Sequence, residues 1–249
     1  MALSCLKNVE NYVRCRPSYP KKLLEYLYSD AGFSRESVIA DIGSGTGLFS
    51  RLLLERGSRV VAIEPDAQMR EVAERLLNDE FVRFVSLSAK AENTTLFNES
   101  INHIVCAHSF HRFNIDECKK EFNRILKPEG KAVFMWNNLD YEDEFTKEYQ
   151  QLIYRWKAPG CNDDCNDSLP SQMSEFFKQD SFTHITFQNP QVVDLNGFKD
   201  RFLSNENITS QCDTAYDEMM DELLKLFERG NRFSKIQICY KIDVYIGKL

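Results

Sequence analysis

The 249-residue sequence has no apolar run that approaches the length of a membrane-spanning helix, which needs about 20 residues. The first residues, Met1 to Glu10, also lack the apolar core of a secretory signal peptide. These two absences predict a cytoplasmic chain with no membrane partner.

A disulfide framework is also missing, because the eight cysteines are scattered without compact spacing. In a chain without an export signal, such cysteines are predicted to be reduced thiols. Cys161 and Cys165 stand close together in a polar stretch, but no second Cys/His pair follows nearby. Two free thiols in a loop explain this pair better than a zinc site does. The sequence therefore predicts no metal.

The charge shows no basic excess. Lysine and arginine total 31 against 38 aspartates and glutamates, and the formal net charge is −7. The densest basic pairs, Lys21–Lys22 and Lys119–Lys120, look like solvated positions on helices. Because nucleic acid repels an acidic surface without a segregated basic face, it is not an expected partner. We expect a small-molecule partner and a monomer or weak dimer.

Strand-like and helix-like segments alternate over about the first 130 residues. Buried strands are predicted at 38–42, 59–63, 82–87, 101–107 and 131–137. Helices are predicted at 20–31, 46–55, 66–77 and 116–126. This alternation is typical of βαβ units and a parallel sheet, which binds ligands beyond the carboxyl ends of its strands.

The pattern changes after Asn138. Helices are predicted at 144–156, 171–178, 196–203 and 215–228, and strands at 182–193 and 236–246. We expect an α/β fold with a doubly wound, mostly parallel seven-stranded sheet in a single domain spanning 1–249. The N-terminal helix (about 12–32) and an insertion (about 140–180) are expected to form a cap over the site.

Three glycines are concentrated at Gly43, Gly45 and Gly47, between the strand at 38–42 and the helix at 46–55. Glycine permits positive φ and a close approach of the backbone to a ligand. The first amides of a helix have no partner within the helix and can face a carboxylate or a phosphate. The loop is therefore predicted to bind a ligand, although a tight strand–helix turn is the simpler interpretation.

The spacing of these glycines separates ligand classes. A Gly-x-Gly-x-x-Gly loop would need glycine where Leu48 stands, and no Gly-Lys-Ser/Thr of a Walker loop follows. Asp41, two residues before the first glycine, can meet a cationic ammonium, which a pyrophosphate site would not need. Glu64 ends the second strand, 23 residues after Asp41, where an acid can bind both hydroxyls of a ribose.

At these positions the chain resembles the class I S-adenosylmethionine-dependent methyltransferases, in their broad small-molecule, methyltransferase type 11-like group. Asp41–Gly47 resembles the first motif of the family, and Glu64 resembles its ribose-binding acid. Leu126–Lys131 resembles the turn before strand five, and Tyr12 with Arg16–Pro20 resembles an N-terminal signature of one branch. The likeness implies a Rossmann-like fold, S-adenosylmethionine as cofactor, and methylation of a small-molecule acceptor.

The resemblance also implies individual contacts with the cofactor. Met69 would pack beside the adenine, Ala91 and Glu92 would read its amino group, and Tyr12 and Arg16 would close over the cofactor. Met69 could equally be core, and Glu92 could be a surface acid. The expected cofactor-binding residues are Tyr12, Arg16, Asp41, Gly43, Ser44, Gly45, Glu64, Pro65, Met69, Ala91, Glu92 and Ala107.

Two histidines, His108 and His111, follow the fourth strand at the mouth of the expected site. Either could act as a general base or orient the acceptor, and either could be a packing residue. We take both as candidate catalytic residues. The branch usually has an Asp before strand four and His-Trp after it, whereas this chain has Asn102 and His111-Arg112. This departure weakens the case for an acceptor transferred from relatives.

Three other interpretations stay open. A nicotinamide-dependent reductase could use the same sheet, although the glycine spacing argues against it. A non-catalytic module could bind S-adenosylmethionine and act through partners. A macromolecular methyltransferase could act on proteins, with nucleic acid the least expected acceptor of an acidic chain.

Overall fold

The computed structural model describes residues 16–157, 169–177, 181–205, 208 and 216–249. The chain divides into two compact units. The first, here called the sheet unit, holds the described residues within 19–136, 164–187 and 242–249. The second, the helical unit, holds those within 16–18, 137–163 and 188–241.

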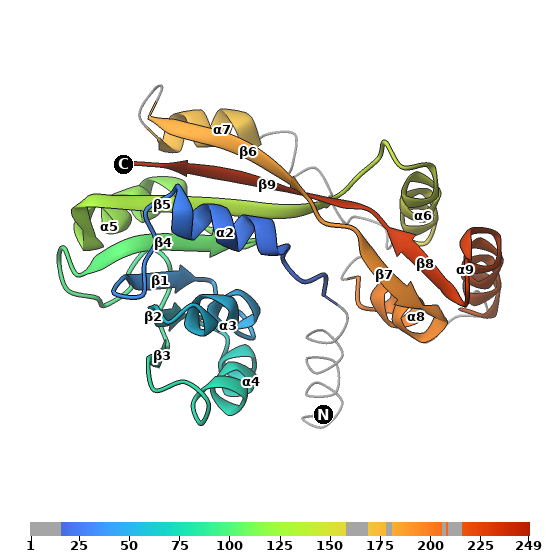
Figure 1. Cartoon of the computed structure of the whole chain (residues 1–249), viewed down its shortest axis with the longest axis horizontal. Helices are drawn as coiled ribbons and strands as arrows, with labels where there is room; N and C mark the ends of the chain where they lie inside the picture. Colours follow the sequence, from blue (N-terminus) through green and yellow to red (C-terminus); the bar gives the residue numbers. More distant parts are fainter. Residues whose placement is uncertain (1–15, 158–168, 178–180, 206–207, 209–215) are drawn as a thin grey trace. The chain divides into compact units, whose positions relative to one another are not determined.

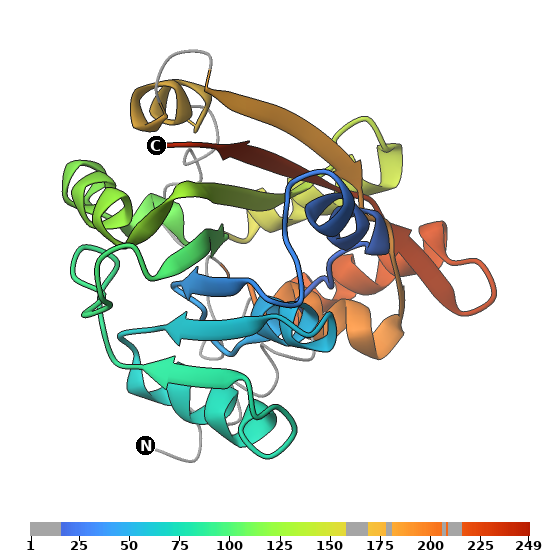
Figure 2. The same cartoon turned by 60° about the vertical axis from the view of Figure 1, so that its left-hand side comes forward.

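A seven-stranded sheet runs through the sheet unit in the order β3-β2-β1-β4-β5-β9-β6 (Figure 1). Its strands are β1 (Val38–Ile42), β2 (Arg59–Ile63), β3 (Phe84–Leu87), β4 (Ile101–Ala107), β5 (Leu126–Leu139), β6 (Phe182–Gln188) and β9 (Tyr240–Gly247). Strands β1 to β5 pair in parallel, and Figure 2 shows the arrows of β1, β2 and β3 pointing the same way. The predicted doubly wound, mostly parallel fold is confirmed.

Helices cover both faces of this sheet. One face buries apolar residues of α2 (Lys21–Ser29), α3 (Leu48–Glu55) and α4 (Ala67–Leu77). The other face buries residues of α5 (Ile115–Ile125) and α7 (Leu169–Phe176). Consecutive side chains of a strand point to opposite faces, and both faces of β1 and β4 are buried, which explains why most residues of both strands are apolar.

Strand β5 is longer than predicted. The sequence indicated a turn at 126–130, but Leu126 already pairs with Ile101, and after a register shift Lys131 pairs with His103. Gly130 makes this continuation possible, since a Cβ there would lie 3.0 Å from the carbonyl oxygen of Asn102. The Pro-Glu-Gly segment is therefore an irregularity within the strand and not a separate turn.

The two C-terminal strands of the prediction are each broken in two. The first splits into β6 and β7 (Gln191–Asp194) at Pro190, which has no N–H to continue a ladder. The second splits into β8 (Lys235–Ile238) and β9 at Cys239. The Cys239 amide donates to Thr146 Oγ1 (2.9 Å), and its carbonyl accepts from the Asp140 amide (2.9 Å). Both backbone groups of Cys239 are thus withdrawn from strand pairing.

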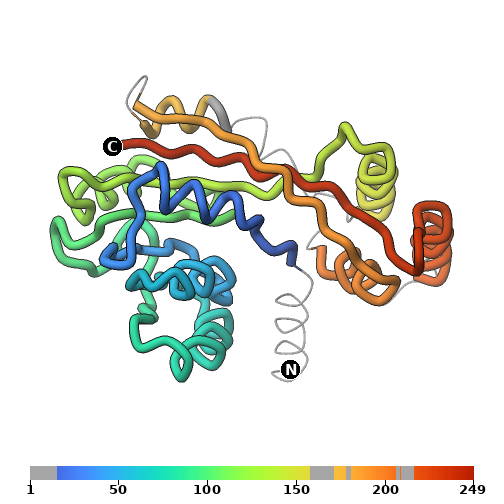
Figure 3. Tube along the Cα trace, viewed as in Figure 1, coloured from blue at the N-terminus to red at the C-terminus, as the bar shows by residue number. Residues whose placement is uncertain are grey.

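The helical unit has its own core. Strands β7 and β8 form a two-stranded antiparallel sheet in this unit. The helical unit also contains the helices α6 (Glu144–Arg155), α8 (Leu195–Leu203) and α9 (Tyr216–Gly230) (Figure 3). Its core buries Tyr149, Phe198, Phe202, Leu223 and Ile238. Helix α2 belongs to the sheet unit and α6 to the helical unit. The single domain and its cap stay predictions.

His103 on β4 predicts an acid-sensitive contribution to stability. Its ring stacks on Phe33, with centroids 4.1 Å apart, and burial lowers its pKa to about 4. In the unfolded chain His103 therefore binds a proton below about pH 6.5, whereas in the folded chain it binds one only below about pH 4. The free energy of unfolding should fall by about 3 kcal/mol from this group as the pH drops through that window.

Urea titrations from pH 7 to pH 4 on the wild type and on His103→Phe measure this contribution. The phenyl ring keeps the stack on Phe33 and removes the titrating group. We expect a smaller loss of stability in the variant. Equal pH slopes in the two proteins would show that His103 does not titrate as its burial implies.

Candidate functional site

The glycine loop lies at the carboxyl end of β1, next to the end of β2. Ile42 pairs with Ile63, and the amides of Gly43 and Ser44 both donate to the Ile63 carbonyl (2.8 and 3.2 Å). Gly43, Gly45 and Gly47 have φ of +68°, +56° and +77°. This left-handed backbone accounts for the three glycines.

The glycine loop is closely packed at Gly43 and open at Gly45. A Cβ at Gly43 would lie 2.5 Å from Ser109 Cβ, so the loop is pressed against the residue after β4. A Cβ at Gly45 would meet nothing within 4 Å. Gly47 precedes α3 and has no side chain that could cap the first amides of this helix. The loop therefore presents open space on its outer side at Gly45.

Glu64 joins the loop to the next helix. Its Oε2 accepts from the Gly45 amide and its Oε1 from the Asp66 amide, both at 2.9 Å. Asp66 caps α4 by accepting from the amides of Gln68 and Met69. Each carboxylate oxygen of Glu64 keeps a lone pair for a further donor. The half-buried Glu64 therefore stands between the glycine loop and the start of α4.

Asp41 is buried at the base of the loop, with 1% of its surface exposed. Its Oδ2 accepts from Ser50 Oγ at 2.6 Å, while its buried Oδ1 has no hydrogen-bond partner. Burial, together with the negative charge of Glu64, raises the pKa of Asp41 to about 7. A buried acceptor without a donor is costly and rare, so a missing cationic or N–H donor would fit here.

Comparison with known proteins identifies the domain around this loop. Residues 40–134 match the family model of a methyltransferase domain. These residues form a methyltransferase domain, and the match supports a class I S-adenosylmethionine-dependent methyltransferase. The chain is 24% identical to an uncharacterized methyltransferase of Schizosaccharomyces pombe over 92% of this chain and 90% of that protein.

Two further proteins are similar to this methyltransferase. A probable S-adenosylmethionine-dependent methyltransferase of Saccharomyces cerevisiae is 24% identical over 82% of this chain and 76% of its own length. The solved structure of a putative type II methyltransferase from Anaeromyxobacter dehalogenans has a TM-score of 0.65 at 18% identity, covering 94% of this chain and 97% of that one. That structure shares the fold.

The residues that were expected to contact the adenine, Met69, Ala91 and Glu92, are partly occupied by contacts within this methyltransferase. Ala91 is buried, and Met69 is half-buried in the first turn of α4. Glu92 Oε1 accepts from the Asn114 amide (2.9 Å), and Glu92 lies beside the Cys118 thiol, whose pKa burial and nearby acids raise. Glu92 therefore ties the segment after β3 to the start of α5. The Glu92 carboxylate has further lone pairs that could accept from a ligand.

The two histidines lie where the sequence placed them, after the carboxyl end of β4. His108 has φ +62°, and its amide donates to the Met135 carbonyl of β5 (2.8 Å). The ring centroids of His108 and His111 are 5.8 Å apart in an edge-to-face arrangement. A non-glycine residue held in the left-handed region is strained, and such strain clusters at functional sites.

Several contacts of the site carry no sequence signal. Ser50 was not predicted, because its role depends on one turn of α3 folding back over Asp41. Ser109 donates to the Ile42 carbonyl (2.7 Å), and Arg70 Nη1 donates to the carbonyls of Glu64 and Pro65 (3.0 and 2.9 Å). Of the other predicted residues, Arg16 belongs to the helical unit, and Tyr12 lies outside the described residues.

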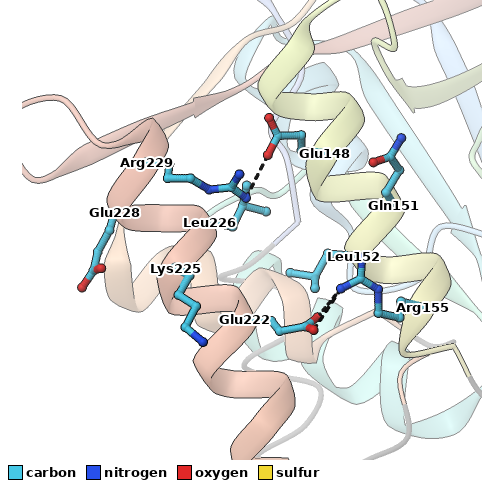
Figure 4. A pocket seen from close by; sticks show the side chains of 9 residues that line it. All are labelled: Glu148, Gln151, Leu152, Arg155, Glu222, Lys225, Leu226, Glu228 and Arg229. Atoms are coloured by element: carbon cyan, nitrogen blue, oxygen red, sulfur yellow. Dashed lines mark hydrogen bonds and ion pairs between the residues drawn. The ribbon is translucent and has the colours of Figure 1, made fainter.

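The helical unit holds a separate open cavity of about 640 Å³ between α6 and α9 (Figure 4). Ion pairs of Arg155 with Glu222 and of Arg229 with Glu148 cross it. It is lined by Glu148, Gln151, Leu152, Arg155, Glu222, Lys225, Leu226, Glu228 and Arg229. None of the predicted site residues belongs to this lining, and we assign it no chemistry.

Within the described ranges, no helix combines the length and the apolar character needed to cross a bilayer. The same residues include no group of three or more His, Cys, Asp or Glu side chains that could hold a metal ion.

Proposed function

We propose that this methyltransferase binds S-adenosylmethionine on the glycine loop and transfers the methyl group to a small-molecule acceptor beyond the carboxyl ends of β4 and β5. The observation that carries the proposal is the buried Oδ1 of Asp41, which has no donor. It lies at the base of a loop whose outer side at Gly45 is open. An ammonium group supplies the missing donor and the opposite charge.

The chain's residues fit the parts of this cofactor. The backbone of Gly43, Ser44 and Gly45 would pass close to the amino-acid end of the cofactor, because the space at Gly45 is open. The first amides of α3 would face the carboxylate, and Asp41 would hold the ammonium. Glu64, already fixed by two amides, would accept from the ribose hydroxyls. The remaining proposed contacts are Pro65, Met69, Ala91 and Glu92 around the adenine, and Ala107 beside the loop.

When bound, the cofactor supplies an already activated methyl group on sulfur. The protein's task is then alignment of the acceptor and exclusion of water. We place His108 and His111 on the acceptor side. One of them would take the acceptor's proton where the acceptor keeps that proton at neutral pH. The strained backbone of His108 fixes the direction of its side chain relative to β5.

A small-molecule acceptor is favoured over a macromolecule by the net charge of −7, which opposes nucleic acid. A protein acceptor is the second candidate, because acidic chains bind basic protein segments. A non-catalytic module that only binds the cofactor is the third. The presence of two histidines after β4, one of them strained, favours an enzyme over that module.

Calorimetric titration with S-adenosylmethionine and S-adenosylhomocysteine, against NADH and ATP, tests the cofactor site. We expect the wild type to bind only the first two ligands. Loss of a buried charge-assisted hydrogen bond should weaken binding about 10- to 100-fold in Asp41→Ala and in Glu64→Ala. Binding of NADH or ATP in preference to the sulfonium pair would refute the assignment.

His111→Gln is the matched control in the same titration. Because His111 is placed on the acceptor side, this variant should bind S-adenosylmethionine within about twofold of wild type. A loss as large as that of Asp41→Ala would move His111 to the cofactor side. With binding established, labelled-methyl transfer to small-molecule and peptide libraries distinguishes the two classes of acceptor.

A further inference from the structure

A tight turn after α9 holds a phenylalanine in an unusual position. Phe233 and Ser234 link Arg232 to Lys235, whose backbones exchange two hydrogen bonds (2.7 and 3.1 Å). Both central residues have positive φ, +54° and +60°. The Ser234 amide also donates to Asn231 Oδ1 at 2.8 Å, which braces the turn. The turn is therefore well defined although neither central residue is glycine.

The folded state gains nothing from Phe233. Turns with two left-handed residues favour Asn-Gly, and a bulky side chain in this region is strained. The Phe233 side chain is 100% exposed, so no burial offsets the strain. Stability does not explain a phenylalanine at this place. A contact with another molecule would explain it, since burial of the Phe233 ring in that contact would supply the hydrophobic free energy that the exposed ring does not gain in the folded chain.

Three basic residues lie close to Phe233 in the sequence. Arg232 and Lys235 flank it directly, and Arg229 stands one turn back at the end of α9. All three are exposed. Arg229 pairs with Glu148 (2.9 Å), whereas Arg232 and Lys235 form no ion pair with any residue in the described part of the chain. An apolar tip thus projects between two cations that form no ion pair among the described residues, with the exposed Asp194 opposite Lys235 in the β7–β8 ladder.

We propose that this turn docks the protein on an anionic lipid surface, with Phe233 inserted among the headgroups and Arg232 and Lys235 on the lipid phosphates. Cations beside an anionic membrane and an aromatic ring at its interface both favour such binding. A protein partner would instead call for further apolar residues around the aromatic anchor, and here the neighbours are charged. The binding is peripheral, so it needs none of the long apolar runs whose absence led us to expect no membrane partner.

Vesicle sedimentation of the full chain at low salt tests this proposal. With phosphatidylserine–phosphatidylcholine vesicles we expect reversible binding, with a partition coefficient on the order of 10³ M⁻¹, below that of one myristoyl chain. Phosphatidylcholine vesicles alone should not retain the protein. The double variant Phe233→Asn, Ser234→Gly keeps the turn, and it should bind about tenfold more weakly.

Two controls separate docking from loss of fold. The double variant relieves the strain, so its melting temperature should rise by about 3 °C while binding falls. Phe97→Asn removes a phenylalanine that is 85% exposed in the sheet unit, and it should leave vesicle binding unchanged.

Absence of binding to anionic vesicles, equal binding to neutral ones, or full binding by the double variant would each overturn the proposal. Retention on immobilised polyglutamate without retention on vesicles would also overturn it and assign the turn to an acidic protein partner.

Discussion

Asp41→Asn is expected to make the ligand-free protein more stable at pH 8 and to abolish tight binding of S-adenosylmethionine. Asp41 is buried, and its pKa of about 7 lies far above its ordinary value of 3.8. At pH 8 the folded protein therefore holds a buried charge that the unfolded chain would hydrate. The asparagine removes this charge and still accepts from Ser50.

The sign follows from proton binding. Between pH 4 and pH 7 the folded state keeps a proton on Asp41 that the unfolded state has lost, so the free energy of unfolding falls as the pH rises. Over about three pH units the buried charge destabilises the wild type by about 4 kcal/mol. The unpaired side-chain amide of the asparagine is itself destabilising, so the variant gains only part of this free energy. We expect a net gain of about 2 kcal/mol at pH 8 in the variant.

Urea titrations at pH 5 and pH 8, with calorimetry of S-adenosylmethionine at pH 8, measure both effects. Wild type should lose stability relative to the variant between the two pH values. The contribution of His103 has the opposite slope, so a His103→Phe background makes the Asp41 effect easier to see. A variant that is less stable than wild type at pH 8, or that still binds the cofactor tightly, would contradict the assignment of Asp41.

We expect Gly43→Ala to reduce mainly the stability of the protein, and Gly45→Ala to reduce mainly the binding of S-adenosylmethionine. At Gly43 the new methyl group meets Ser109 Cβ at 2.5 Å, so the loop must move, and we expect a loss of about 3 kcal/mol of stability. At Gly45 nothing lies within 4 Å, and only the positive φ costs free energy, about 1 kcal/mol. That methyl group enters the open space assigned to the cofactor, so binding should weaken about 100-fold.

Gly32→Ala is the matched control, because Gly32 also has positive φ (+92°) and open space and lies outside the site. It should lose about as much stability as Gly45→Ala and bind S-adenosylmethionine as wild type does. Melting curves and calorimetry on the three variants are the measurements. Normal binding by a folded Gly45→Ala protein would show that the cofactor does not approach this side of the loop.

The central strands of the sheet unit were predictable because burial on both faces of the sheet makes most of their residues apolar. β1, β2 and β4 have the predicted bounds. The C-terminal strands were predicted less well. Nothing in the alternation of Ile236 to Ile246 reveals that Thr146 and Asp140 capture the backbone of Cys239. Such a break depends on contacts between residues about 90 positions apart, which local patterns do not encode.

The candidate site also contains residues that the sequence could predict and residues that only the structure reveals. Asp41, Glu64 and the glycines could be proposed as site residues from the sequence because each stands at a fixed place relative to a strand end. Ser50 and Ser109 were missed, since a serine is common at helix starts and turns and only the folded backbone shows which carbonyl or carboxylate it reaches. The environment of Asp41, buried with one oxygen unmatched, also emerged only from the structure.

The double anchorage of Glu64 has a consequence for how fast a ligand can bind. One carboxylate already holds the amides of Gly45 and Asp66. The loop and the start of α4 are thus ordered before any ligand arrives, and little chain entropy remains to be lost on association. A ligand would meet a backbone that is already held in place, so we expect the encounter itself, rather than folding of the loop, to set the rate of binding.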